Sequence, residues 1–303
     1  MKKEYNQKPV AVTKSVNREV AIFSTDVPDS NIDHSVVHSF GEEWKKFHRF
    51  SDVEIEHDAK LYFDILSDEM LNKNSYVADF GCGTGRWAKY LAPKAGFIEA
   101  IDPSDAIFVA DKLIDKADNV RLTKASIDSI PFPDETFDLA MSIGVLHHIP
   151  DTQKAMNDCV KKVKIGGYFY TYLYYDFENR NSGFKALFSV VDAIRKRTSR
   201  LPMKPKKFVC DVLAITVYLP VVSAGRLLRF AGFKKLAQQM PLSHYQNNSF
   251  LWMRTDALDR FGTTLEQRFS RDDIRQMMVN AGLADLSFSD QMPYWHVVGK
   301  REK

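Results

Sequence analysis

Three closely spaced glycines form the most informative motif in the sequence, Asp79-Phe-Gly81-Cys-Gly83-Thr-Gly85. The motif follows an apolar run and precedes a stretch with helical spacing. Glycines allow the backbone to turn sharply and to approach a ligand closely, and the N-terminus of the following helix offers unpaired N–H groups. The pattern predicts a loop that binds a small ligand, although the glycines alone also fit a dinucleotide.

Two carboxylates at the ends of predicted strands distinguish a dinucleotide from a ligand with an ammonium group. Asp79 lies two residues before Gly81, where a carboxylate suits an ammonium group and repels a pyrophosphate. The glycine spacing also differs from the GxGxxG spacing of dinucleotide-binding folds. A second acid, Asp102, follows 17 residues after Gly85, where it can accept hydrogen bonds from both hydroxyls of a ribose. The alternative is a structural turn with incidental acids.

The elements around this loop alternate between strands and helices, which implies right-handed crossovers and a parallel sheet. Strands are predicted at residues 76–80, 97–101, 120–124, 137–143, 167–174, 286–289 and 294–300. Helices are predicted at residues 57–71, 86–91, 105–114, 151–163 and 270–280. The expected fold is therefore a doubly wound, Rossmann-like α/β sheet of seven strands.

The alternation stops at Asp176 and resumes at the capping box Ser270-Arg-Asp-Asp273. This break predicts an α/β domain of residues 56–176 plus 265–303, with a helical insertion of residues 177–264 after strand five. Residues 1–35 are polar and aperiodic, which predicts a loose arm. The aromatic residues Phe40, Trp44, Phe47 and Phe50 are spaced as on one face of a helix. We expect residues 1–55 to form an arm and an aromatic helical lid, with packing against the sheet edge as the alternative.

The composition of the 303-residue chain, with 45% hydrophobic residues and a net charge of +3, suits a globular α/β protein. The three cysteines, Cys82, Cys159 and Cys210, have no paired spacing, which argues against a disulfide framework or a metal site and favours a reducing compartment. The longest apolar stretch, residues 208–222, is broken by Asp211 and Pro220 and is shorter than the roughly 20 residues of a spanning helix. We expect a cytoplasmic protein.

Charge is unevenly distributed along the chain. Residues 194–254 contain twelve basic residues and one acid, a formal charge of +11, which leaves −8 for the rest. Basic flanks around an apolar helix fit peripheral membrane contact through residues 195–235, at the inner membrane face. They also fit a pocket for an anionic ligand or a solvated face over a buried helix. Nucleic acid is a further, less favoured partner.

The motifs together resemble class I methyltransferases, especially the group that includes the ubiquinone and menaquinone C-methyltransferases. The resemblance lies in the glycine motif with Asp102, Ile130-Pro-Phe-Pro-Asp-Glu-Thr-Phe-Asp138, Gly144-Val-Leu-His-His148 and Lys164-Ile-Gly-Gly167. It implies S-adenosyl-L-methionine as the cofactor and no metal. The implied cofactor contacts are Asp79, Gly81, Gly83, Gly85, Asp102, Pro103, Ser126, Ile127 and Ile143. Many relatives have an acid where Ser126 stands, so this chain departs from the pattern at the adenine.

The methyl acceptor is expected at the carboxyl ends of the strands, beside the cofactor. The candidates for catalysis are His148, Tyr172, Tyr174 and His244. Each has a structural alternative: a role shared by many relatives for His147 and His148, ordinary strand positions for the tyrosines, and a surface loop for His244. We expect residues 177–264 to cap the acceptor site.

Residues 241–296 resemble uncharacterised bacterial methyltransferases, some of which lie among surface-polysaccharide functions. This resemblance implies transfer of a methyl group to a small-molecule or sugar-containing acceptor, and lipid-linked and anionic acceptors are among the candidates. The alternatives are C-methylation of a quinone-like lipid, RNA methylation, and a cofactor-binding protein without transfer activity.

Overall fold

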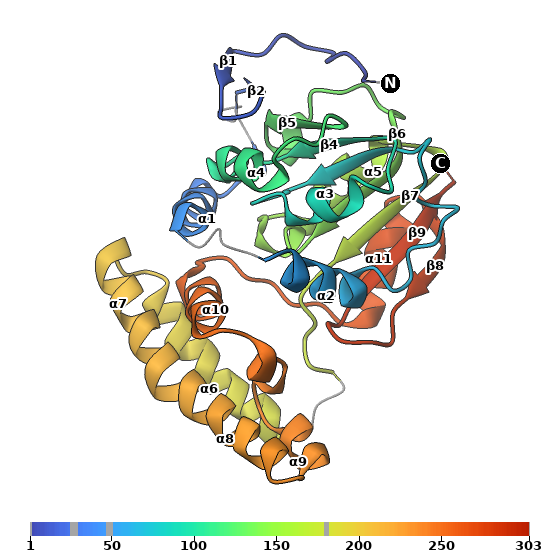
Figure 1. Ribbon diagram of the computed structural model, residues 1–303. Helices are drawn as coiled ribbons and strands as arrows, with labels where there is room; N and C mark the ends of the chain where they lie inside the picture. The colour runs from blue at the N-terminus through green and yellow to red at the C-terminus, as the bar shows by residue number, and fades with distance from the viewer. Residues whose placement is uncertain (1, 25–29, 47–50, 179–181, 303) are drawn as a thin grey trace. The chain divides into compact units, whose positions relative to one another are not determined.

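The computed structural model describes residues 2–24, 30–46, 51–178 and 182–302 (Figure 1). The chain divides into two compact units, residues 1–178 with 265–303 and residues 179–264. The first unit holds every strand of the described chain, and the second holds helices α6 to α10.

The first unit is built on one mixed sheet in the order β1-β2-β5-β4-β3-β6-β7-β9-β8. The strands are β1 Ala11–Lys14, β2 Glu19–Ile22, β3 Tyr76–Phe80, β4 Phe97–Ile101, β5 Val120–Lys124, β6 Phe137–Ile143, β7 Val163–Tyr172, β8 Leu283–Phe288 and β9 His296–Arg301. The six strands β2-β5-β4-β3-β6-β7 pair in parallel with their neighbours in this order, whereas β9 pairs antiparallel with both β7 and β8. The α/β class is as expected, but the sheet of the described residues has nine strands and not seven.

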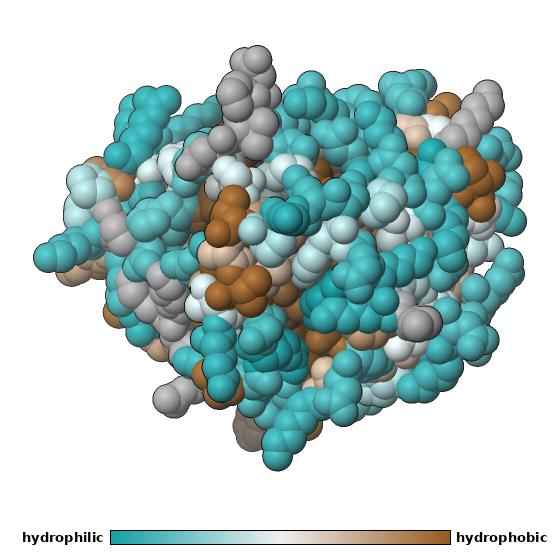
Figure 2. All heavy atoms as spheres, turned by 90° about the horizontal axis from the view of Figure 1, so that it is seen from above, coloured by the Kyte–Doolittle hydropathy of each residue, from teal (hydrophilic) through white to brown (hydrophobic). Residues whose placement is uncertain are grey.

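Helices cover both faces of this sheet, so alternate strand residues enter two different cores. Val77 packs with helices α2 Asp52–Tyr62, α3 Arg86–Leu91 and α4 Ala106–Ile114. Its neighbour Ala78 packs with α5 Thr152–Lys161 and α11 Arg271–Asn280 on the other face. Burial on both faces explains why the parallel strands are nearly continuous apolar runs. The molecular face in Figure 2 is mainly hydrophilic with separate hydrophobic patches.

The N-terminal residues are not a loose arm. Strands β1 and β2 form an antiparallel hairpin, and β2 extends the sheet beyond β5. Tyr5 packs against Phe23 and Phe132 and lies under the guanidinium of Arg121. The Arg121 side chain also donates to the Lys3 carbonyl, so residues 3–22 are fastened to the domain by long-range contacts.

Of the two helices before the glycine motif, the first contains Phe40 and Trp44 as their spacing predicts, and the second differs from its expected position. Helix α1 spans His34–Lys46, and α2 begins at Asp52 and ends at Tyr62, whereas a helix over 57–71 was expected. Ser51 and Glu54 form a capping box that fixes the start of α2. The capping box expected at Ser270 is present and starts α11.

The second unit is helical throughout its described residues. Its elements are α6 Ser182–Thr198, α7 Met203–Leu213, the π-helix η3 Ala214–Tyr218, α8 Leu219–Phe230, α9 Lys234–Gln239, the 3₁₀ helix η4 Ser243–Asn247 and α10 Phe250–Gly262. Helices α7, η3 and α8 form one continuous helix, Lys204–Phe230, of 27 residues. By length and composition this helix could cross a membrane, so the expectation that Pro220 and Asp211 interrupt the apolar stretch is wrong.

Candidate functional site

The glycine loop joins β3 to α3, and its three glycines differ in their surroundings. All three have positive φ, at 77° for Gly81, 53° for Gly83 and 76° for Gly85. A Cβ on Gly81 would lie 2.5 Å from Val145, and one on Gly85 would lie 2.6 Å from Ile114. The same atom on Gly83 would meet, among the described residues, only Trp44, at 3.6 Å. Gly81 and Gly85 therefore permit close packing of the loop, whereas a Cβ on Gly83 would make an ordinary van der Waals contact with Trp44 and no clash.

Asp79 is a buried acid at the end of the central strand β3. Its side chain is only 1% exposed, and its Oδ2 has no hydrogen-bond partner among the residues that the structure describes. Burial, together with the nearby charge of Asp102, raises the pKa of Asp79 to about 8, and Arg86 opposes this shift only in part. A buried carboxyl oxygen without a partner is costly unless a ligand satisfies it. The geometry therefore suits a cationic ligand group at Asp79.

Asp102 ends β4 and shapes the glycine loop itself. Its Oδ2 accepts a hydrogen bond from the Gly83 N–H at 2.8 Å, and its Oδ1 accepts from the N–H and the hydroxyl of Ser104. Burial raises the pKa of Asp102, and these hydrogen bonds oppose that shift. Ribose hydroxyls would therefore share a carboxylate that already holds the loop. Pro103 follows it and is partly exposed.

The segment after β5 contains a carboxylate that sequence reasoning did not use. The Ser126 hydroxyl donates to Asp128 and also contacts the Ser129 hydroxyl at 2.8 Å. The other oxygen of Asp128 accepts from the Asn31 N–H. Ile127 is buried beside them. Ser126 is therefore committed to this network, and Asp128 is the acid that this segment places after β5.

Helix α1 lies along the carboxyl ends of three neighbouring strands. A Cβ on Gly41 would lie 3.4 Å from Ser104, which follows β4, and Trp44 is the neighbour of Gly83 after β3. The Phe40 ring is 5.0 Å from that of His148, which follows β6. The part of the predicted lid that the structure describes thus borders the glycine loop, while Phe47 and Phe50 lie outside the described residues.

The two histidines and two of the tyrosines meet beside this loop. His147 stacks on Tyr174 with ring centroids 3.9 Å apart, and His148 lies 4.1 Å from His147. Tyr172 ends β7 and packs against Tyr174 at 5.8 Å. Ile143 ends β6 nearby and is 8% exposed. Because Val145 contacts the glycine loop, this aromatic cluster adjoins the Asp79 site.

The two histidines differ in their hydrogen-bond partners. His147 is fully buried, and neither ring nitrogen has a hydrogen-bond partner in the described part of the chain; burial holds its pKa well below the ordinary value, so the ring is neutral. His148 Nδ1 lies 2.7 Å from the Leu265 carbonyl oxygen. A carbonyl only accepts, so Nδ1 carries the proton, and in the neutral ring Nε2 carries the lone pair.

The segment that returns to the sheet domain after the second unit supports this cluster. Gln267 donates from its backbone to the His147 carbonyl and from its side chain to the Ile149 carbonyl and to Thr152. The Arg268 guanidinium lies 5.2 Å from the Tyr174 ring. Neither Gln267 nor Arg268 was a candidate from the sequence. Gln267, in particular, contacts residues that lie more than 100 positions earlier in the chain. The side chain of the fourth candidate, His244, lies outside what the structure describes.

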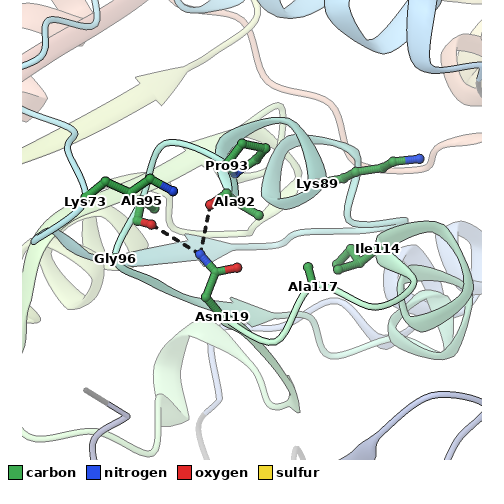
Figure 3. Close-up of a pocket in the computed structure, with 9 residues that line it drawn as sticks. All are labelled: Lys73, Lys89, Ala92, Pro93, Ala95, Gly96, Ile114, Ala117 and Asn119. Carbon is green, nitrogen blue, oxygen red and sulfur yellow. Dashed lines mark hydrogen bonds between the residues drawn. The ribbon is translucent and has the colours of Figure 1, made fainter.

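A pocket of about 510 Å³ lies at the other end of the strands (Figure 3). Lys73, Gly96 and Asn119, which precede β3, β4 and β5, line it. Figure 3 shows the Asn119 amide donating to the carbonyls of Ala92 and Ala95, at 2.8 and 3.2 Å. These bonds fix the ends of secondary structures, and ligands of such sheets bind at the carboxyl ends, so this pocket is not the candidate site.

Comparisons with known proteins agree with this geometry. Residues 78–171 match a family model described as a methyltransferase domain. The ubiquinone biosynthesis O-methyltransferase of Coxiella burnetii is 24% identical over 172 residues, which cover 54% of this chain and 70% of the relative. The chain is a class I S-adenosylmethionine-dependent methyltransferase.

Two further relatives show how widely this class varies. The sarcosine/dimethylglycine N-methyltransferase of Halorhodospira halochloris is 31% identical to this chain over 104 residues, which cover 33% of this chain and 37% of the relative. The solved structure of an O-methyltransferase family protein from Burkholderia thailandensis matches with a TM-score of 0.50 and 14% identity, and the match covers 86% of this chain and 58% of that protein's chain. The solved structure supports the fold alone.

The cofactor of the methyltransferase is S-adenosylmethionine, and the residues present fit it. The cofactor carries an ammonium group, and Asp79 offers a buried acid oxygen that no described residue satisfies. Gly83 leaves space beside it that a side chain would occupy. The fit thus rests on both the charge and the shape of the glycine loop.

Proposed function

We propose that the methyltransferase acts on a small-molecule acceptor held at the carboxyl ends of β6 and β7. The observation that carries this proposal is the unpartnered Oδ2 of Asp79, which adjoins the histidine and tyrosine cluster through the contact of Gly81 with Val145. A cofactor site and an aromatic acceptor site side by side on one sheet edge match the requirement that transfer needs two aligned reactants.

On the cofactor side, each residue has a distinct role in the proposal. S-adenosylmethionine, when bound, supplies a methyl group activated by a sulfonium centre. Asp79 would hold the ammonium, Asp102 would accept from the ribose hydroxyls, and Gly83 would admit the cofactor backbone. Ser126, Ile127 and the adjoining Asp128 would border the adenine. Trp44 of α1 would cover the loop and exclude water.

On the acceptor side, His148 is the proposed base. Its Nδ1–H donates to the Leu265 carbonyl, which orients the ring, and Nε2 of the neutral ring would accept the proton of an acceptor hydroxyl. Tyr172 and Tyr174 are both half-buried, and they would orient the acceptor with their rings and hydroxyls. His147 is buried and neutral, and it would act as a packing surface beneath Tyr174.

The acceptor class is the finer part of the proposal. A sugar-containing or lipid-linked acceptor follows from the resemblance of residues 241–296, and C-methylation of a quinone-like lipid is the alternative. RNA methylation would require the basic residues of the second unit as a free surface. Several are used internally instead: Arg195 donates to Thr263, Lys206 to Gly262, and Arg226 to Gln246. The RNA alternative is therefore the weaker one.

An activity screen tests the proposal. The chain is incubated with S-adenosylmethionine labelled on the methyl group and with cell extract separated into polar, lipid and RNA fractions. We expect label in the polar or lipid fraction, and much less label with Asp79→Asn at pH 8 and a sub-saturating concentration of cofactor. Label confined to RNA would refute the small-molecule proposal, and bound cofactor without any transfer would refute catalysis.

A further inference from the structure

The helix Lys204–Phe230 of the second unit has two opposite faces. One is buried at Lys206, Cys210, Ala214, Tyr218, Val222 and Gly225. The other is exposed at every position of a second stripe, which we call the outer face: Lys204, Phe208, Val212, Ile215, Leu219, Ser223, Leu227 and Phe230. Phe208, Leu227 and Phe230 are 69%, 67% and 92% exposed. Six of the eight outer positions are thus large apolar residues in contact with solvent.

The π-helix η3 keeps both faces straight. Buried positions recur every four residues from Lys206 to Val222. In an α-helix, residues four apart differ by about 40° around the axis, so such a stripe would wind round the helix. The wider turn of Ala214–Tyr218 takes up this drift. The outer face therefore stays on one side of a helix about 40 Å long, at 1.5 Å per residue.

Polar contacts hold the inner side of this helix along its length. Lys206 donates to the Gly262 carbonyl at 2.9 Å, Asp211 pairs with Arg254 at 2.7 Å, and the Tyr218 hydroxyl donates to Asp256 at 2.9 Å. Further along, Arg226 donates to carbonyls of residues 245–248. A helix that crossed a bilayer would have to break these contacts or carry them into hydrocarbon. The helix therefore stays on its unit and offers only its outer face.

Charge around the outer face favours an anionic partner. Residues 179–264 contain fifteen Lys and Arg against four Asp, a formal charge of +11. Exposed basic residues flank both ends of the helix: Lys196, Arg197 and Arg200 before it, Lys204 at its first position, and Lys234 and Lys235 after it. Phe233 and Leu236, 61% and 52% exposed, extend the apolar surface beside the last two.

We propose that the outer face and its flanking basic residues bind the surface of an anionic lipid bilayer, with the helix parallel to the membrane. An apolar stripe between two basic clusters matches the acyl boundary and the headgroup phosphates, respectively. This partner goes beyond the proposed transfer reaction, since binding of the cofactor by the sheet unit does not require it.

Flotation of the full chain with vesicles tests this surface. Vesicles of phosphatidylcholine with phosphatidylglycerol should carry the parent chain, and pure phosphatidylcholine should carry about tenfold less. Replacing two outer residues, Phe208→Glu with Phe230→Glu, should lower the bound fraction about tenfold, because charges would enter the acyl boundary. The matched control is Ile165→Glu with Val279→Glu, two 52% exposed apolar residues of the sheet unit, which should float like the parent.

Other measurements separate this surface from its alternatives. Lys234→Gln with Lys235→Gln should weaken binding to anionic vesicles, and more so at low salt. S-adenosylmethionine affinity should be the same in all these variants, so loss of flotation is distinguishable from loss of the transfer site. The proposal is overturned if the parent does not float, if the Phe208/Phe230 variant floats equally, or if alkaline carbonate fails to release the chain. A dimer that this variant abolishes, without flotation, would assign the face to a second copy.

Discussion

Asp79→Asn should weaken S-adenosylmethionine binding by an amount that depends on pH. With a pKa of about 8, the Asp79 carboxyl is mainly protonated at pH 7, and ionising it to meet the cofactor ammonium costs about 1.4 kcal/mol. The cofactor amine loses its own proton near pH 8. Parent affinity should therefore rise about tenfold between pH 6 and 7 and be highest near pH 8.

The asparagine variant avoids the ionisation but loses the charge. A charge-assisted hydrogen bond contributes roughly 1.5–3 kcal/mol. At pH 6 the parent spends about 2.7 kcal/mol on ionisation, so the two proteins should bind alike. At pH 8 that cost nearly vanishes, and the variant should bind roughly 10- to 100-fold more weakly.

Isothermal titration calorimetry at pH 6, 7 and 8, in buffers of different ionisation enthalpy, measures both affinity and proton release. At pH 7 the parent should release nearly one proton per cofactor bound, and the Asp79→Asn variant almost none. A parent affinity that is independent of pH, with no proton release and an unimpaired variant, would refute the assignment of Asp79.

The same substitution should stabilise the protein without cofactor. Because the folded pKa of Asp79 is raised, the folded state holds an extra proton between about pH 4 and 8, and the free energy of unfolding falls there by about 1.4 kcal/mol per pH unit. Asparagine removes this loss. Urea denaturation of both proteins at pH 5 and 8 should show an advantage for Asp79→Asn that grows with pH; a constant difference would contradict the buried-acid account.

Three further predictions concern the loop and the core. Gly83→Ala should fold, with roughly 1–2 kcal/mol of stability lost to its left-handed backbone, but it should lose cofactor affinity in calorimetry. Gly85→Ala should be the less stable of the two variants in urea denaturation, because its Cβ would lie 2.6 Å from Ile114; equal effects of the two substitutions would contradict this distinction. Asp102→Asn must turn its amide NH₂ toward either the Gly83 or the Ser104 N–H, so stability and affinity should both fall, by about 1–3 kcal/mol for the unmade bond. Arg121→Met should cost about 3–5 kcal/mol in urea denaturation, because it leaves the fully buried Glu99 unpaired, and adding Glu99→Leu should recover part of it.

The sequence was most informative where local pattern and burial agree. Strands β3 to β6 lie at the predicted residues because each is a short apolar run, bounded by turn residues and buried on both faces. The acid at the end of β3 and the glycine loop after it follow from the same pattern. Asp79, Gly83 and Asp102 consequently lie on one edge, as the spacing of the motif predicts.

Features that depend on distant partners were not predictable. All four residues of β1 are exposed, so no alternation indicates a strand, and the hairpin is held by contacts such as that of Asn17 with Asp111. Pro220 reads as a helix breaker, but it follows a π turn that keeps the helix continuous. The charge count treats Arg195 and Lys206 as surface residues, although each is only 7% exposed and bound to a backbone carbonyl.

The two points where the chain leaves and re-enters the sheet unit are fastened to each other. Tyr175 bridges to Phe269, and the Asp176 N–H donates to the Phe269 carbonyl. A segment whose ends are already joined can be lengthened, shortened or exchanged at little entropic cost to the domain that carries it. Residues 179–264 can therefore be exchanged as one inserted segment during evolution. Such an exchange would change the acceptor or the localisation of the protein and leave the cofactor-binding domain as it is.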